Sequence, residues 1–527
     1  MPQVPHFATV DPASGMTASN PGRVQNLVGG AWADANRYRD DIVDPMDGEK
    51  FLLVPDTGDH GPFIQGLKNC PKSGLHNPLK NPERYVALGD VCAKAAAMLR
   101  NEDVRDFFTC LIQRVMPKSW PQCAAEVTVT RVYLENFSGD SVRFLGRGFS
   151  NPGDYCGYET RGYRWPFGPV VIIAPFNFPL EIPALQVMAA LFMGNRPLVK
   201  VDSKVSVVFE QFLRLLIEAG LPATDIDLIH CSGSGMGQLL DQANDHIRMV
   251  QFTGSSSVAE HVSGVVNGAV RIEDAGFDWK VLGPDFRPEW LDYVAWQSDQ
   301  DAYAASGQKC SAQSILFVHG NWEQALLPKL ADIAARRKLD DLSLGPVLTW
   351  TNDNMLAHFD ALLAITDAQL LFGGKALEGH SIPACYGAME ATAIKVPLSA
   401  LGGEHFELIT TEVFGPFQVV VSYTDSDLPL VLQTLERMSH HLTAGIVSND
   451  PIFLNKVLGE TVNGTTYCGM RGRTTGAPQN HWFGPSGDPR AAGIGTPEAI
   501  ITTWSGHREI ISDEGPLPDT WAPPPPT

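Results

Sequence analysis

The stretch Pro169-Val170-Val171-Ile172-Ile173-Ala174 is a short β-branched run, ended by Pro175, that is typical of a fully buried strand. A helical pattern follows over 179–193, with a proline at its start. The alternation then continues, with strands expected at 198–200, 226–230, 248–252 and 269–273 and helices expected at 203–219, 236–242 and 255–266. Alternating strands and helices with short links predict an α/β fold built on a parallel, doubly wound sheet.

Several polar or small residues directly follow these strands, at 175–177, 200–203, 253–255 and at Glu273. Doubly wound sheets bind their ligands beyond the carboxyl ends of the strands, so we expect these residues to line one crevice.

Two turns in this region are candidates for a nucleotide site. Gly233-Ser234-Gly235-Met236-Gly237 lacks the third glycine of a dinucleotide fingerprint, because residue 238 is Gln238, and an ordinary strand-to-helix turn is the favoured interpretation. The turn at 252–259 joins a strand to a helix N-terminus, where free amides and the helix dipole attract phosphate. A helix capped by serine is the alternative there.

Composition limits the class of protein. A chain of 527 residues is expected to form more than one domain. The net charge of −20 argues against nucleic acid or an anionic membrane as a partner, and no apolar run approaches the roughly 18 residues of a membrane span. The nine cysteines are odd in number and contain no C-x-x-C, so we expect neither a disulfide framework nor a metal site.

The pattern changes on both sides of this region. Strands are expected at 142–146 and 155–163 around the turn signal Asn151-Pro152-Gly153-Asp154, as an oligomerisation arm or a surface flap. A second α/β pattern covers 276–465, with strands near 314–318, 370–372, 417–421 and 444–447. The Gly- and Pro-rich segment 463–495 is long for a loop, which predicts a functional role.

Cys310 lies between small residues in Ser306-Gly307-Gln308-Lys309-Cys310-Ser311-Ala312. A cysteine held open in this way is a candidate covalent nucleophile, because its thiolate is strongly nucleophilic. An inert, buried cysteine is the alternative.

Five stretches follow one another along the chain: Phe176-Asn177-Phe178-Pro179, Phe252-Thr253-Gly254-Ser255, Glu273, Gly307-Gln308-Lys309-Cys310 and Glu412-Val413-Phe414-Gly415-Pro416. Taken in order, these motifs resemble the aldehyde dehydrogenase superfamily over about residues 25–510. More narrowly, 273–280 and 473–485 are similar to the plant-type Δ1-pyrroline-5-carboxylate dehydrogenases.

The resemblance implies three structural parts. They are a Rossmann-type NAD-binding domain at 1–140 and 160–275, a catalytic domain at 276–465, and a β-hairpin oligomerisation or bridging element at 141–159 and 478–515. It also implies a homodimer or homotetramer and a place in the mitochondrial matrix. No presequence is visible before residue 26, so the cytoplasm stays an alternative.

The implied reaction is NAD-dependent oxidation of L-glutamate γ-semialdehyde, formed from Δ1-pyrroline-5-carboxylate, to L-glutamate in proline catabolism. Cys310 would form a thiohemiacetal and then a thioester, Asn177 would stabilise the oxyanion, and Glu273 would activate water. Without the resemblance, Asn177 is equally a turn residue and Glu273 a solvated strand end. Another semialdehyde or an aliphatic aldehyde is the alternative substrate, while a cofactor-free thiol hydrolase and a non-catalytic assembly protein are rival functions.

The resemblance also implies which residues contact the cofactor. Ser203 stands where NAD-preferring relatives often carry glutamate, so NADP is an additional, weaker cofactor. The full set comprises Ile173, Ala174, Pro175, Phe176, Lys200, Ser203, Gly233, Phe252, Thr253, Gly254, Ser255, Val258, Glu412 and Phe414.

For the substrate, the resemblance implies Phe178, Ser311, Gly484, Pro485 and Ser486. Amides in a glycine-rich loop can hold a carboxylate, although a purely structural loop is the alternative at 484–486. The sequence Glu273-Asp274-Ala275-Gly276 departs from the usual Glu-Leu-Gly-Gly, so we expect a different local backbone.

Overall fold

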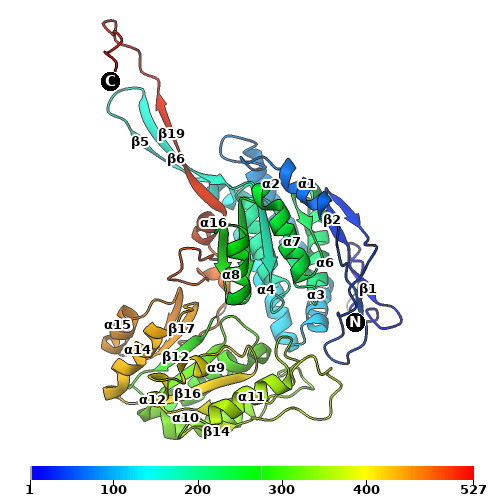
Figure 1. Ribbon diagram of the computed structural model, residues 1–527, viewed down its shortest axis with the longest axis vertical. Coiled ribbons are helices and arrows are strands. Elements are labelled where there is room, and N and C mark those ends of the chain that lie inside the picture. Colours follow the sequence, from blue (N-terminus) through cyan, green and yellow to red (C-terminus); the bar gives the residue numbers. More distant parts are fainter. Residues whose placement is uncertain (1–2, 275) are drawn as a thin grey trace.

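The computed structural model describes residues 3–274 and 276–527, and it contains two lobes and a protruding arm (Figure 1). Each lobe is built on a seven-stranded, mostly parallel sheet, and the arm is a sheet of three strands. The predicted α/β class is confirmed. Ala275, part of the Glu273–Gly276 motif, and residues 1–2 lie outside the described ranges.

The first sheet has the strand order β11-β10-β7-β8-β9-β2-β3. Its neighbours from β11 to β9 pair in parallel, and β2 and β3 add an antiparallel edge. The strands are β7 (Pro169–Ala174), β8 (Arg196–Val201), β9 (Asp227–Leu228), β10 (Met249–Thr253), β11 (Val270–Glu273), β2 (Asn26–Val28) and β3 (Ala31–Ala33). Small strands β1 (Gly22–Arg23) and β4 (Leu52–Leu53) pair separately.

Helices cover both faces of this sheet because side chains alternate along each strand. Val170 and Ile172 pack with one set of helices, whereas Val171 packs with the other. The first face carries α2 (Glu83–Arg100), α3 (Glu102–Val115), α4 (Trp120–Asn136), α5 (Glu181–Phe192) and α6 (Ser206–Glu218). The second face carries α1 (Gly61–Asn69), α7 (Gly233–Ala243) and α8 (Ser256–Val265).

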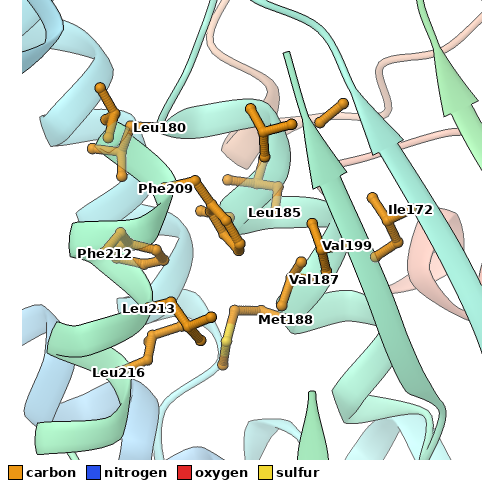
Figure 2. Packing of buried hydrophobic residues seen from close by; sticks show 14 of the residues in the cluster. Ile172, Leu180, Leu185, Val187, Met188, Val199, Phe209, Phe212, Leu213 and Leu216 are labelled. Atoms are coloured by element: carbon orange, nitrogen blue, oxygen red, sulfur yellow. The ribbon is translucent and has the colours of Figure 1, made fainter. Parts of the chain in front are cut away.

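Helix α5 is buried along its whole length between the sheet and α6. Figure 2 shows Phe209 and Leu213 of α6 facing Met188 of α5, with Val199 of the sheet beyond. A helix that is apolar all round is expected in such a central position. This packing fixes the turn that leads from β7 into α5.

The second sheet has the order β14-β15-β16-β13-β12-β17-β18 and is parallel except for β14. Its strands are β12 (Asp278–Leu282), β13 (Gln313–His319), β14 (Gln369–Phe372), β15 (Thr392–Lys395), β16 (Phe417–Tyr423), β17 (Thr443–Val447) and β18 (Thr465–Cys468). The four strands predicted in this region are present. Its helices are α9 (Leu291–Tyr303), α10 (Gly320–Ala334), α11 (Asn352–Leu363), α12 (Leu398–Leu401), α13 (Phe406–Ile409), α14 (Leu428–Arg437) and α15 (Pro451–Gly459).

The arm consists of β5 (Phe149–Pro152), β6 (Tyr158–Pro166) and β19 (Ser505–Asp513), which follows α16 (Pro497–Trp504). Figure 1 shows it extending away from both lobes. The strand predicted at 142–146 is wrong: Arg143–Gly146 forms a 3₁₀ helix, because Val142 and Leu145 are buried in the core. Among the described residues, none of the helices is long and apolar enough to cross a membrane.

Candidate active site

Cys310 follows an unusual backbone segment between α9 and β13. Ala305, Ser306 and Gly307 all have positive φ, between 55° and 69°. A side chain at Gly307 would collide with the carbonyl of Gly415, so only glycine fits there. Such strain persists where surrounding contacts impose it, and here Ser306 Oγ donates to the Gly345 carbonyl at 3.2 Å. The segment gives Cys310 a defined position.

Two cavities meet at Cys310. One has a volume of about 490 Å³ and the other about 340 Å³. Cys310, Glu273 and Ile182 line both of them. A nucleophile at such a junction can contact two different ligands.

The larger cavity lies beyond the carboxyl ends of β7, β8 and β10, as the sequence predicted for the ligand crevice. Ser255 precedes α8, but its side chain forms no capping hydrogen bond. The cavity contains the predicted Ile173, Ala174, Pro175, Phe176, Lys200, Gly233, Phe252, Thr253, Gly254, Ser255, Val258, Glu412 and Phe414, together with Asn177.

Ser203 is the exception. It is buried, its hydroxyl donates to the Cys231 carbonyl at 3.4 Å, and it does not line the cavity. Its neighbour Asp202 lines the cavity instead; it belongs to the 200–203 stretch expected at the crevice, but it was not among the cofactor contacts that the resemblance implied. Burial acts to raise the pKa of Asp202, but the charges of Lys204 and Lys200, together with hydrogen bonds from Lys204, lower it, and the net shift of the pKa is downward. Asp202 is therefore a carboxylate facing the cavity.

Asn177 lies at the start of the turn from β7 to α5 and is buried. Its backbone carbonyl accepts a hydrogen bond from Lys118 Nζ at 3.1 Å. Its side-chain Oδ1 has no hydrogen-bond partner within residues 3–274 and 276–527. The backbone is thus held while the amide remains available to a ligand.

Glu273 is the last residue of β11 and is 3% exposed. Burial raises its pKa to about 7, and the charge of Asp274 adds to this. Hydrogen bonding with the Cys310 thiol and the Thr253 hydroxyl acts in the opposite direction. A carboxyl group with a pKa near neutrality is suited to general base catalysis.

The Cys310 thiol has a pKa raised well above its usual range, first by burial and then by the charges of Glu273 and Asp278. The thiol is therefore protonated, and it is the donor toward the Glu273 carboxylate. In the larger cavity, Phe414 has a φ of 51° and packs edge-on to Phe176 at 5.9 Å between ring centroids.

The smaller cavity contains the predicted Phe178 and Ser311. It does not contain Gly484, Pro485 or Ser486. Ser486 instead donates its backbone N–H to the His441 carbonyl at 3.2 Å, and Gly484 packs against Ala492. The segment Thr475–Pro478 lines the cavity, so the earlier part of the 473–485 stretch supplies the loop.

A buried lysine borders the smaller cavity next to the nucleophile. Lys309 Nζ donates to the Gln300 carbonyl at 2.9 Å and to Thr475 Oγ1 at 3.2 Å. Ser311 Oγ also donates to Thr475 Oγ1, at 3.2 Å. Burial lowers the pKa of Lys309 to about 8, so the ammonium form still predominates at neutral pH. The sequence offered no periodic signal for this lysine beyond its place beside Cys310.

The chain matches the aldehyde dehydrogenase family over residues 88–489. It is 58% identical to Delta-1-pyrroline-5-carboxylate dehydrogenase 12A1, mitochondrial, of Arabidopsis thaliana, over 99% of this chain and 94% of that one. It is 57% identical to a probable aldehyde dehydrogenase of Linum usitatissimum, with the same coverage. An NAD-dependent aldehyde dehydrogenase from Sinorhizobium meliloti shares the fold, with a TM-score of 0.80 and 19% identity over 98% of this chain and 99% of that one. The chain belongs to the aldehyde dehydrogenase family.

Proposed function

We propose that the protein oxidises L-glutamate γ-semialdehyde to L-glutamate with NAD. The observation that carries the proposal is the position of Cys310 and Glu273 at the junction of two cavities. The name of the Arabidopsis relative, a Δ1-pyrroline-5-carboxylate dehydrogenase, supports the choice of substrate, since that compound is the cyclic form of the semialdehyde.

The chemistry follows from three side chains. Cys310 sulfur attacks the aldehyde carbon while its proton passes to Glu273, and the product is a thiohemiacetal. The Asn177 amide and the Cys310 backbone N–H stabilise the oxyanion that forms. After oxidation leaves a thioester on Cys310, Glu273 releases the thiol proton to solvent. It then removes a proton from water, which attacks the thioester and releases the acid and the Cys310 thiolate.

The larger cavity fits a dinucleotide. The N-terminus of α8, free of a side-chain cap, would hold a pyrophosphate, and Asp202 would accept hydrogen bonds from the adenosine ribose. When bound, NAD accepts the hydride that oxidation releases. The Asp202 carboxylate would repel a 2′-phosphate, so NADP is the weaker cofactor in this proposal.

The smaller cavity suits a substrate that carries a carboxylate. Lys309 supplies positive charge, and the hydroxyls of Ser311 and Thr475 lie beside it. Gly476 and Ala477 line the same side and can offer backbone N–H groups. We assign recognition of the substrate α-carboxylate to this group of residues rather than to 484–486.

The test is a comparison of aldehydes with purified enzyme and NAD. We expect kcat/KM to be highest for glutamate semialdehyde and lower for succinate semialdehyde and propionaldehyde. Lys309→Met should raise KM for glutamate semialdehyde about tenfold or more while leaving propionaldehyde nearly unchanged. A strong preference for an aldehyde without the α-amino acid group would overturn the substrate assignment.

We also propose a homo-oligomer and a place in the mitochondrial matrix. Two strands of the arm, β19 and β5, form open sheet edges that another copy can cover, and exposed Ile511 and Phe149 lie on them. The compartment is inferred from the Arabidopsis relative, whose name places it in the mitochondrion. Light scattering of the purified protein and fractionation of cells test these two points.

A further inference from the structure

A cluster of buried polar side chains lies beneath Glu273. Thr253 and Glu273 are register partners on the parallel strands β10 and β11, so their side chains project from the same face. Gln251 is two residues before Thr253 and shares that face, which α5 covers with Gln186. Gln186 and Gln251 are each 1% exposed.

Both glutamines donate to the same oxygen. Gln186 Nε2 donates to Thr253 Oγ1 at 2.8 Å, and Gln251 Nε2 donates to it at 2.9 Å. A hydroxyl group has two lone pairs and one proton. With both lone pairs occupied, Thr253 can take part in a further hydrogen bond only as the donor.

The carboxyl group of Glu273, the register partner of Thr253, is the candidate acceptor for the hydroxyl proton. Its Oε1 has no hydrogen-bond partner among the residues that the structure describes. We propose that Thr253 is a positioning residue that donates a hydrogen bond to the Glu273 carboxylate, and that Gln186 and Gln251 impose this direction by occupying both lone pairs of the hydroxyl. The inference rests on the proposed role of Glu273 as the base that hydrolyses the thioester.

A hydrogen bond donated to a carboxylate stabilises its charged form and lowers its pKa. Thr253 therefore opposes the burial that raises the pKa of Glu273 to about 7. Other titratable groups face the same carboxylate, namely Cys310, Asp274, Asp278 and Glu412, with Glu181 bordering the smaller cavity beside it. Of these groups, Asp274 acts with burial to favour the protonated form of Glu273, whereas Thr253, like the Cys310 thiol, is a neutral donor that favours the carboxylate.

The test uses hydrolysis of p-nitrophenyl acetate by the full chain without cofactor. Cys310 sulfur attacks the ester carbonyl, p-nitrophenolate leaves, and an acetyl thioester remains. Water activated by Glu273 then hydrolyses the thioester to acetate. Acetate release from the acetyl enzyme in a single turnover reports this second step, and it needs no dinucleotide in the cofactor cavity that Thr253 also lines.

We expect Thr253→Val to move the acid limb of the pH–rate profile upward by about one pH unit, because a charge-assisted hydrogen bond is lost. The rate at pH 7 should fall about fivefold and recover near pH 9. Thr253→Ser should restore the wild-type profile, and Gln186→Leu should give a smaller upward shift. Thr434→Val is the matched control, at a buried threonine whose hydroxyl donates to the Leu430 carbonyl. It should change neither the position of the acid limb nor the rate at pH 7.

An acid limb that stays in place in Thr253→Val, or a rate lowered equally at every pH, would overturn the inference. Failure of the proposed function gives a different result, since Glu273→Gln would then hydrolyse the thioester at the wild-type rate. A slow Glu273→Gln variant together with a shifted Thr253→Val profile supports both assignments.

Discussion

The ammonium of Lys118 and the carboxylate of Glu126 lie 2.7 Å apart, and neither side chain has any solvent exposure. Lys118 also donates to the Asn177 carbonyl, and Glu126 Oε1 accepts the backbone N–H groups of Leu180 and Glu181 at 2.8 and 3.1 Å. The ion pair on α4 and the segment before it thus hold both ends of the turn that presents Asn177.

Replacing one partner of this pair leaves a buried charge without compensation. We expect Lys118→Met to lower the free energy of unfolding by about 3–5 kcal/mol. Urea denaturation measures the change, and Lys72→Met at an exposed position is the control. A loss no larger than that of the control would show that the pair does not hold the turn.

Cys310→Ser should reduce aldehyde oxidation to below about a thousandth of the wild-type rate, because the nucleophile is lost. Cys468→Ser, at an exposed cysteine, should keep full activity. NADH formation at saturating aldehyde measures both variants. Oxidation surviving in Cys310→Ser would remove the proposed mechanism.

The pKa of Glu273 predicts how hydrolysis of the thioester depends on pH. The base acts only when deprotonated, so the rate should rise between about pH 6 and pH 8, around the pKa of about 7. Glu273→Gln should be slow across the same range without this rise. Single-turnover hydrolysis of the acetyl enzyme at a series of pH values measures this rise. A wild-type rate that stays constant from pH 6 to 8 would contradict the role of Glu273 as the base.

Glu181 couples folding to pH. Burial raises the pKa of this carboxyl group to about 8, and the charge of Glu126 adds to the effect. A folded-state pKa above the unfolded one means that the group's stabilisation is fully present below about pH 4.5 and is lost as pH rises through about 8.

Glu181→Gln should therefore reduce the decline of unfolding free energy between about pH 5 and pH 9. Urea denaturation at several pH values measures this slope. Glu83→Gln on the exposed start of α2 provides the comparison and should decline as the wild type does. An unchanged slope in Glu181→Gln would contradict the raised pKa.

Asp202 is expected to decide between the two dinucleotides. Asp202→Asn removes the charge that faces the larger cavity, so the ratio of kcat/KM for NADP to that for NAD should rise about tenfold or more. Ser203→Ala should leave the ratio unchanged, because Ser203 is buried away from the cavity. Initial rates with each cofactor measure this ratio. A ratio that rises in Ser203→Ala and not in Asp202→Asn would contradict the assignment to Asp202.

The first sheet was predictable because its signals are local. Runs such as 169–174 are apolar on both faces and end at proline, and the helices between them carry periodic apolar residues. Strand β12 was missed since Asp278 and Lys280 are charged but buried. Their partners, the Thr443 N–H and the carboxylate of Asp301, lie in distant parts of the chain. The domain boundaries proposed from the resemblance stay predictions.

The site was predictable where it depends on strand ends and less so where it depends on turns. Residues after β7 and β10 reach the larger cavity because parallel strands end together. Whether Asp202 or Ser203 faces that cavity depends on the turn after β8, which sequence patterns do not specify. Lys118 and Lys309 contact residues that are far away in the sequence, Asn177 and Thr475. No spacing of residues along the chain identifies such contacts.

The arm has a consequence for how the protein is made. Strand β19 pairs with β6 along the full length of both strands, although β6 precedes the whole second lobe in the chain. During translation, the backbone groups on one edge of β6 therefore have no hydrogen-bond partners until residues 505–513 leave the ribosome. Throughout that interval the open edge of β6 can pair with another nascent chain. We therefore expect ribosome-bound chaperones to bind the hairpin of β5 and β6.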